Sequence, residues 1–153
     1  LAFGLGSGLS PKAPGTAGSA LSLLFFPVLV ALGLWGSIGL IVIASIFGVW
    51  LCGAAADILN VHDHEAIVWD EFVGQWLTLL PLIPIAAWNL QTYSYLVLGF
   101  ALFRLFDILK PWPISWCDKH LEGGFGIMFD DVLAGVAAGG FLWLTINNGW
   151  LAF

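Results

Sequence analysis

Long apolar stretches make up most of the chain, and only alternate connections between them are charged. The stretches without a charged residue are 19–34, 38–56, 72–88, 93–103 and 132–153. A transmembrane helix needs about 20 predominantly apolar residues, and 38–56 meets this requirement directly. The pattern therefore predicts an all-α, membrane-embedded bundle of about four to five apolar helices, formed by a single domain over residues 1–153.

Two of these stretches contain proline, namely Pro27 in the first and Pro81 and Pro84 in the third. Proline removes a backbone hydrogen bond and kinks or breaks a helix. We therefore expect these two helices to be kinked or to cross the bilayer incompletely. The fourth stretch is long enough to span only if it continues to residue 109, with Arg104 and Asp107 near the interface.

The charged residues fall in alternate connections between the predicted helices. If the five helices cross in alternation, every charge lies on one face of the membrane. Because a charge inside the bilayer costs about 2.5 to 3.5 kcal/mol on insertion scales, charges are expected in loops, but this does not explain why they occupy alternate loops only. The few basic residues share this face, so the positive-inside tendency predicts that it is cytoplasmic.

Composition supports this interpretation and narrows the function. The chain is 60% hydrophobic and 9% charged, with a mean hydropathy of +0.98, whereas soluble domains average about 25% charged residues. A formal net charge of -6 argues against a nucleic-acid partner, because such proteins carry basic surfaces. An acidic excess on a membrane protein suggests cation binding instead.

Pairs of adjacent carboxylates precede two of the apolar stretches. Asp70 and Glu71 stand before 72–88, and Asp130 and Asp131 stand before 132–153. Like charges this close are unfavourable unless a cation lies near them, and magnesium prefers oxygen ligands. We therefore predict a Mg²⁺ site at the polar face. The candidate ligands are Asp57, Asp63, Asp70, Glu71, Asp130 and Asp131.

Simpler interpretations exist for parts of this set. Asp130 and Asp131 as acidic residues at a helix start would gain about 0.3 to 1 kcal/mol from the helix dipole, although one aspartate would suffice. His62 and His64 are candidates for zinc binding or acid–base chemistry. A solvated loop is the favoured interpretation of these histidines, because no third ligand accompanies them at metal spacing.

A glycine- and proline-rich segment, 4–19, predicts an irregular loop that ends where the first apolar helix begins. Backbone N–H groups at that helix start, with the hydroxyls of Thr16 and Ser19, are suited to phosphate binding. The alternative is structural: Pro14 and Gly15 form a turn and Ser19 caps the helix.

Arg104, Asp107 and Lys110 recur at every third residue, which places them in one sector of a helix. The Arg104 guanidinium is shaped for bidentate phosphate recognition, so Arg104 and Lys110 are candidate phosphate-binding residues. An internal salt bridge between Arg104 and Asp107 is the alternative.

Four segments resemble the phosphatidylglycerophosphatase A family of bacterial inner-membrane lipid phosphatases. They read LSPKAPGTAGS (9–19), VWDEFVGQW (68–76), FRLFDILKPWPI (103–114) and GIMFDDVLAG (126–135). They follow the family's order and spacing, and the match that they belong to covers nearly the whole chain. The resemblance implies an all-helical fold and magnesium-dependent hydrolysis of phosphatidylglycerophosphate to phosphatidylglycerol and inorganic phosphate, a step of glycerophospholipid biosynthesis.

The resemblance also implies roles for individual residues. The family's acidic motif residues are Asp57, Asp63, Asp70, Glu71, Asp107, Asp130 and Asp131, with Arg104 and Lys110 as basic partners. Its loop residues are Pro14, Gly15, Thr16, Gly18 and Ser19. The expected catalytic set is Asp70, Glu71, Asp107, Asp130 and Asp131. The expected partners are the substrate lipid and the surrounding membrane lipids, with no obligate protein partner.

A metal-activated water is the preferred nucleophile, and an aspartyl-phosphate on Asp70, Asp130 or Asp131 is the alternative. The competing class of function is a membrane cation transporter or channel, in which acidic residues near helices mark an ion path. A transporter commonly shows internal repeats, and the chain has none. A lipid-transferring synthase is a third class, but its aspartate-glycine-alanine-arginine signature is absent.

Overall fold

The computed structural model describes residues 1–60 and 64–150, and within these ranges every regular element is a helix. The predicted all-α fold is confirmed. The elements are the 3-10 helix η1 (Gly4–Leu9), α1 (Pro14–Ser22), the 3-10 helix η2 (Leu23–Phe25), α2 (Phe26–Leu59), α3 (Trp69–Leu79), the 3-10 helix η3 (Leu80–Ile85), α4 (Leu90–Leu109), α5 (Ile114–His120) and α6 (Gly123–Asn147).

The first two predicted membrane helices are the two arms of one helical hairpin. The arms meet at Gly33, whose backbone has φ 68° and ψ 178° inside α2. A residue without Cβ adopts this left-handed φ at little cost, so the chain reverses there. The hydroxyl of Ser37 donates to the carbonyl of Leu29 across the bend at 2.8 Å.

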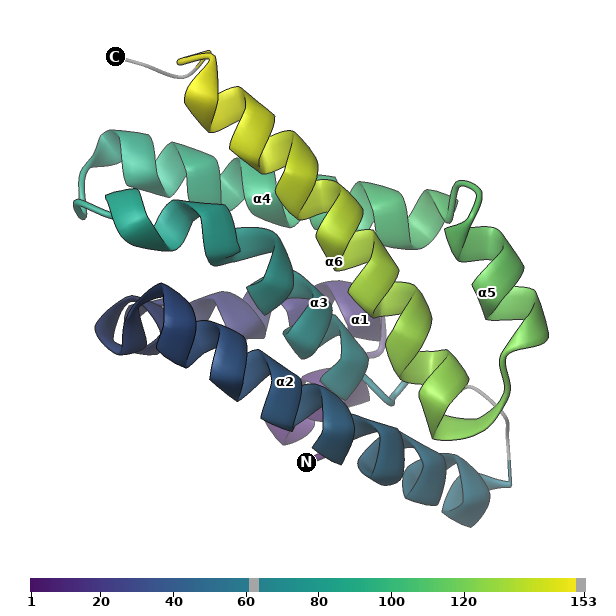
Figure 1. Cartoon of the computed structure of the whole chain (residues 1–153). Helices are drawn as coiled ribbons and strands as arrows, with labels where there is room; N and C mark the ends of the chain where they lie inside the picture. Colours follow the sequence, from purple (N-terminus) through teal and green to yellow (C-terminus); the bar gives the residue numbers. More distant parts are fainter. Residues whose placement is uncertain (61–63, 151–153) are drawn as a thin grey trace.

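The third apolar stretch forms a short helix, as its prolines predicted. The regular helix α3 has 11 residues, and the 3-10 turn η3 replaces it where Pro81 and Pro84 occur. At a rise of about 1.5 Å per residue, α3 is about 16 Å long, roughly half of a ~30 Å hydrocarbon core. Its sides are covered by other helices, so it is the central element of the bundle (Figure 1).

The last helix begins earlier than the hydrophobic pattern indicated. Helix α6 starts at Gly123, and its first turn contains no acidic residue. The glycine-rich segment before Asp130, whose composition is typical of a turn, is helical. Its glycines let α6 pack closely on α2: a Cβ at Gly124 would meet the carbonyl oxygen of Val49 at 1.8 Å. Asp130 and Asp131 lie in the third turn of α6, so the helix-dipole interpretation of this pair is wrong.

Three helical stretches are long and apolar enough to cross a membrane: Pro14–Leu59, Leu90–Leu109 and Gly123–Asn147. Their arrangement agrees with the predicted separation of charge. In Figure 1 the turn inside α2, the start of α4 and the C-terminal end of α6 lie at the left, whereas the ends of α2 and α4, helix α5 and the start of α6 lie at the right. The elements at the right carry charged residues at these ends, and the connections at the left carry none.

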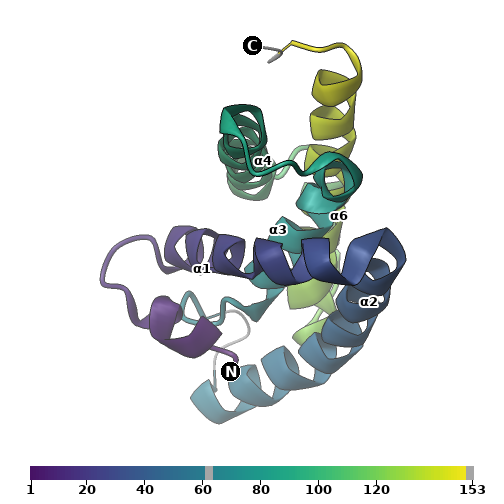
Figure 2. The same cartoon turned by 90° about the vertical axis from the view of Figure 1, so that its left-hand side faces the viewer.

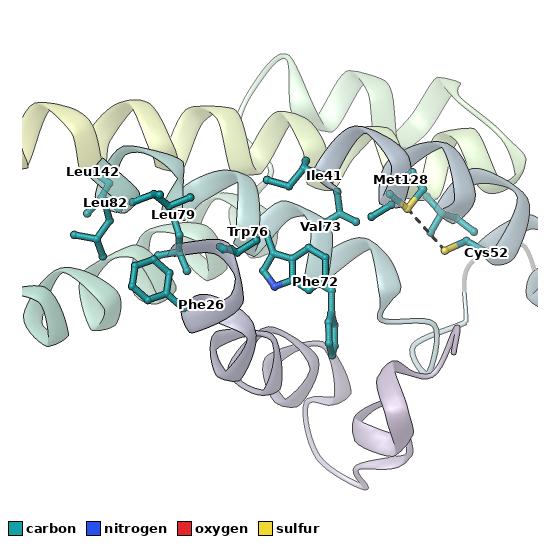
Figure 3. Close-up of a cluster of buried hydrophobic side chains, with 14 of the residues drawn as sticks. Phe26, Ile41, Cys52, Phe72, Val73, Trp76, Leu79, Leu82, Met128 and Leu142 are labelled. Atoms are coloured by element: carbon teal, nitrogen blue, oxygen red, sulfur yellow. Dashed lines mark hydrogen bonds between the residues drawn. The ribbon is translucent and has the colours of Figure 1, made fainter. Parts of the chain in front are cut away.

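The hydrophobic core follows the length of α3. Figure 2 shows α3 between the α1–α2 hairpin on one side and α4 with α6 on the other. Figure 3 shows the side chains that fill this space, from Leu82 and Leu142 at one end to Cys52 and Met128 at the other. The indole N–H of Trp76 in the middle donates to the carbonyl of Ser22 at 3.1 Å.

Helices α3 and α6 cross with their backbones in contact, at Gly74 and Gly135. A Cβ at Gly135 would lie 2.5 Å from the Gly74 carbonyl oxygen, and one at Gly74 would lie 2.7 Å from the carbonyl oxygen of Asp131. The Thr78 hydroxyl reaches the carbonyl oxygens of Gly74 and Gly135 at 3.0 and 3.3 Å. Small residues permit such close approach, and the crossing brings the first turn of α3 beside the third turn of α6.

Candidate functional site

Three carboxylates meet one helical turn from this crossing. Asp70 and Glu71 come from the first turn of α3 and Asp131 comes from α6. One oxygen of each lies within 4.8 Å of the other two, and they form the one group of this kind in the part of the chain that the structure describes. Asp70 is 8% exposed and Asp131 is 3% exposed, so this carboxylate cluster lies inside the bundle.

The carboxylate cluster contains buried acceptor atoms without a partner. Oε2 of Glu71 and Oδ2 of Asp131 are inaccessible and accept no hydrogen bond. Burial, and then the charge of Asp131, raises the pKa of Glu71 well above its ordinary value, against the hydrogen bond with Asp70 and the charge of Arg104. Buried charges normally pair with an opposite charge or coordinate a metal, so the cluster has the electrostatic character of a cation site.

A guanidinium lies at the edge of the carboxylate cluster. Nη1 of Arg104 is 2.5 Å from Oδ2 of Asp107 and 3.8 Å from Oε1 of Glu71, and it donates to the hydroxyl of Ser19 at 3.4 Å. The internal salt bridge considered from the sequence is thus present. Asp107 and Glu71 are the carboxylates that contact this guanidinium. Asp70 and Asp131 lie with Glu71 in the cluster, so the carboxylates outnumber the one guanidinium beside them.

The start of α1 packs directly on this group. A Cβ at Gly15 would lie 2.1 Å from Oε1 of Glu71 and 3.1 Å from Nη1 of Arg104, so the backbone of α1 touches both charged groups. Helix α1 begins at Pro14, five residues earlier than the sequence indicated. Ser19 therefore does not cap the helix: its hydroxyl donates to the Gly15 carbonyl at 2.8 Å within it.

The helix start itself carries no side-chain cap. The residue before α1, Ala13, makes no capping hydrogen bond, so the first N–H groups of the helix keep their capacity to donate. Thr16 is half-buried in this first turn. The two hydroxyls selected from the sequence thus occupy the first and second turns of α1, and that of Ser19 contacts Arg104.

Asp130 faces away from the carboxylate cluster. Its Oδ1 accepts the backbone N–H of Asp131 at 3.0 Å, and its Oδ2 pairs with the ammonium of Lys110. The same ammonium lies 2.5 Å from Oδ1 of Asp118. Burial lowers the pKa of Lys110, but the hydrogen bonds and charges of Asp118 and Asp130 outweigh it, so its pKa lies above its ordinary value and the ammonium stays charged.

The remaining predicted residues lie elsewhere. Asp57 is exposed on the last turn of α2, and the structure does not bring it to the cluster. Asp63 and His62 lie outside the described residues. His64 accepts the backbone N–H of Ala66 through Nδ1 at 3.1 Å, which agrees with a structural role in the loop.

Two polar residues beside this site were not identified from the sequence. Asp118 is one. Pro111 separates it from the helix that leads to Lys110, so the spacing of the two residues in the sequence does not indicate that they pair. Gln75 is the other: it is fully buried, and both atoms of its amide lack a partner. The sequence did contain a signal for Gln75. It is the single amide in the apolar stretch 72–88, and four residues after Glu71 it lies on the same face of the helix as Glu71.

A family model and several known proteins match most of this chain. A family model described as phosphatidylglycerophosphatase A matches residues 1–146. A protein of that name from Escherichia coli (strain K12) is 45% identical over 98% of this chain and 83% of its own length. Another, from Haemophilus influenzae, is 48% identical over 90% of this chain and 82% of its own length.

A third relative has a different name. A protein from Bacteroides thetaiotaomicron, provisionally named a phosphatidylinositol-3-phosphatase, is 39% identical over 87% of this chain and 83% of its own length. No solved structure matches the chain.

Proposed function

The chain belongs to the phosphatidylglycerophosphatase A family, and from this membership and the buried carboxylate cluster we propose that it removes the terminal phosphate of phosphatidylglycerophosphate in a magnesium-dependent reaction. The products are phosphatidylglycerol and inorganic phosphate. The observation that supports this most strongly is the convergence of Asp70, Glu71 and Asp131 from two helices to within 4.8 Å inside the bundle.

The donor set fits a magnesium ion. Its atoms are all carboxylate oxygens, which hard cations prefer, and two of them, Oε2 of Glu71 and Oδ2 of Asp131, have no other partner. When bound, a divalent cation polarises phosphoryl oxygens and lowers the pKa of a coordinated water. Asp130 is not part of this donor set in the structure, because both of its oxygens have partners in the protein.

The protein's own cations and helix start suit the phosphate. The uncapped N-terminus of α1 presents N–H groups and the partial positive charge of the helix, a combination that binds phosphate in many proteins. Thr16 and Ser19 add hydroxyls there. Arg104 and Lys110 then offset negative charge as the phosphate departs. Nη1 of Arg104 is paired with Asp107, whereas its buried Nε has no partner and can donate to the phosphate.

Direct attack by water is the proposed route. The alternative route forms an aspartyl phosphate, which is an acyl phosphate, and Asp130 is poorly placed for it because its oxygens are held by Lys110 and the Asp131 N–H. Acid quenching of turnover with substrate labelled in the terminal phosphate separates the two. Label retained on the chain would favour the aspartyl route, and its absence at every quench time would favour water.

We place the protein in the bacterial inner membrane as a multi-pass protein, with the carboxylate cluster at the cytoplasmic side. The support is the gathering of the charged segments at one end of the bundle (Figure 1) and the positive-inside tendency. This geometry leaves acyl chains among the apolar helices while the doubly phosphorylated head group reaches the polar end.

The experiment is phosphate release by purified protein in mixed micelles, with Mg²⁺ and with a chelator. Phosphatidylglycerophosphate and phosphatidylinositol-3-phosphate are compared, since a relative is provisionally named for the second lipid. We expect magnesium-dependent release from the first lipid and little from the second. Absence of release together with saturable cation movement in liposomes would instead support the transporter.

A further inference from the structure

Lys110 connects three helices at the polar end of the bundle. It is the residue that ends α4, with a left-handed backbone (φ 40°). Its ammonium lies between Asp118 of α5, at 2.5 Å, and Asp130 of α6. The side chains of Asp118, Lys110 and Asp130 are 35%, 26% and 8% exposed, respectively, so Asp118 holds the ammonium from the solvent side and Asp130 holds it from inside.

The inner contact places this ammonium beside the carboxylate cluster. Asp130 is adjacent in sequence to the cluster residue Asp131, and its second oxygen accepts the Asp131 N–H. Asp130 is thereby fixed at both oxygens. The position of the Lys110 ammonium is therefore defined relative to the cluster on its inner side.

The outer contact, between Lys110 and Asp118, restricts the ammonium further. An ammonium has three N–H donors, and Asp118 and Asp130 use two of those of Lys110. A lysine carries its charge on a flexible four-carbon stem, so the direction of the third donor depends on having both partners in place. With Asp130 alone, the ammonium would rotate freely about that single contact.

We propose that Asp118 is a positioning residue for the reaction: together with Asp130 it fixes the Lys110 ammonium so that the third N–H points to an oxygen of the substrate's terminal phosphate. This inference rests on the proposed function, because it assigns Lys110 to phosphate binding. A residue that only fastened α5 to the bundle would affect stability but neither substrate affinity nor the effect of Lys110.

The experiment measures phosphate release by the full chain in mixed micelles, at saturating Mg²⁺, against the mole fraction of phosphatidylglycerophosphate. We expect Asp118→Asn to raise KM about tenfold with kcat within about twofold, as for the loss of one charge-assisted contact. Asp118→Glu should recover most of the affinity. Glu122→Gln is the matched control, because it removes one exposed acidic charge that contacts no part of this group, and it should leave KM unchanged.

A double-mutant cycle tests whether Asp118 acts through Lys110. In a Lys110→Met background, Asp118→Asn should cause no further rise in KM, because the group that it positions is absent. If Asp118→Asn does not fold, KM is measured for Asp118→Ser in both backgrounds instead. An unchanged KM in these variants, or an equal rise in both backgrounds, overturns this inference alone. Lack of phosphate release by the unmodified protein overturns the proposed function and this inference together.

Discussion

Gly74 of α3 and Gly135 of α6 are in backbone contact, and the candidate site depends on this contact. A Cβ on Gly135 would lie 2.5 Å from the Gly74 carbonyl oxygen. Asp70 precedes Gly74 by four residues and Asp131 precedes Gly135 by four, so each carboxylate lies one helical turn from the crossing. The distance between the two helices therefore sets the distance between the carboxylates.

Substituting Gly135 by alanine should consequently damage both the fold and the site. The new methyl group meets backbone atoms that cannot rotate away, and such overpacking costs about 1 to 3 kcal/mol. We expect a lower unfolding midpoint in detergent and at least a roughly tenfold loss of phosphate release. Gly140→Ala is the control on the same helix, where a Cβ meets nothing within 4 Å. Equal behaviour of the two variants would contradict the role given to the crossing.

Gly15→Ala should reduce activity with a smaller effect on stability. Its Cβ would lie 2.1 Å from Oε1 of Glu71, so the Glu71 side chain must move away from the carboxylate cluster. Displacing a catalytic group by about 1 Å lowers the reaction rate on the order of a hundredfold. Gly39→Ala, at an open helical position of α2, should keep the original rate. A normal rate for Gly15→Ala would show that Glu71 is not needed in its observed position.

Neutral variants of the carboxylates should separate those of the cluster from the others. Asp70→Asn, Glu71→Gln and Asp131→Asn should each abolish most turnover while the protein remains folded. Asp130→Asn should also lower turnover severely, because Asp130 is the contact that places the Lys110 ammonium beside the cluster, whereas Asp118 only directs its third N–H donor. The Mg²⁺ concentration for half-maximal rate should change little. Asp57→Asn, at an exposed position, should be near normal. Kinetics against Mg²⁺ concentration provide the measurement, and near-normal rates in all cluster variants would refute the site assignment.

Magnesium should stabilise the protein through the same residues. A ligand that binds only the folded state raises its stability by about 2.7 kcal/mol at a hundred times its Kd, and cation binding also relieves repulsion among the buried carboxylates. We expect Mg²⁺ to raise the thermal unfolding midpoint of the unmodified protein. Asp131→Asn should lose this increase and Asp57→Asn should retain it. The same increase in both variants would place the cation elsewhere.

Arg104→Lys should not be a conservative substitution. Arg104 contacts Asp107, Glu71 and Ser19 through Nη1, and its buried Nε is left to donate to a phosphate. A lysine has one nitrogen and lacks this planar fork of donors. Removing one partner of a buried charge pair costs about 3 to 5 kcal/mol when the other charge is left uncompensated. We expect Arg104→Lys to retain part of the stability but to raise KM for the lipid, and Arg104→Gln to lose both. A normal KM in Arg104→Lys would argue against phosphate binding by this residue.

Much of the fold followed from local patterns. Runs of apolar residues defined the helices, and the positions of Pro81 and Pro84 indicated the short third helix, because proline acts on the backbone of its own turn. Adjacent carboxylates before two apolar stretches predicted a cation site, and three of these four residues meet in the carboxylate cluster. These signals are readable from the sequence because helix formation and bilayer burial depend on nearby residues.

The tertiary structure decided where the helices end and which charged residues pair with one another. The sequence did not reveal that α6 begins at Gly123, that Asp130 is held by Lys110 while Asp131 joins the cluster, or that Asp118 completes that ion pair. Two aspartates adjacent in sequence point about 100° apart on a helix, so their partners depend on which neighbouring helices pack on each side. The sequence by itself determined which residues are charged and how they are spaced, and only the contact between the backbones of α3 and α6 decided which of them share one site.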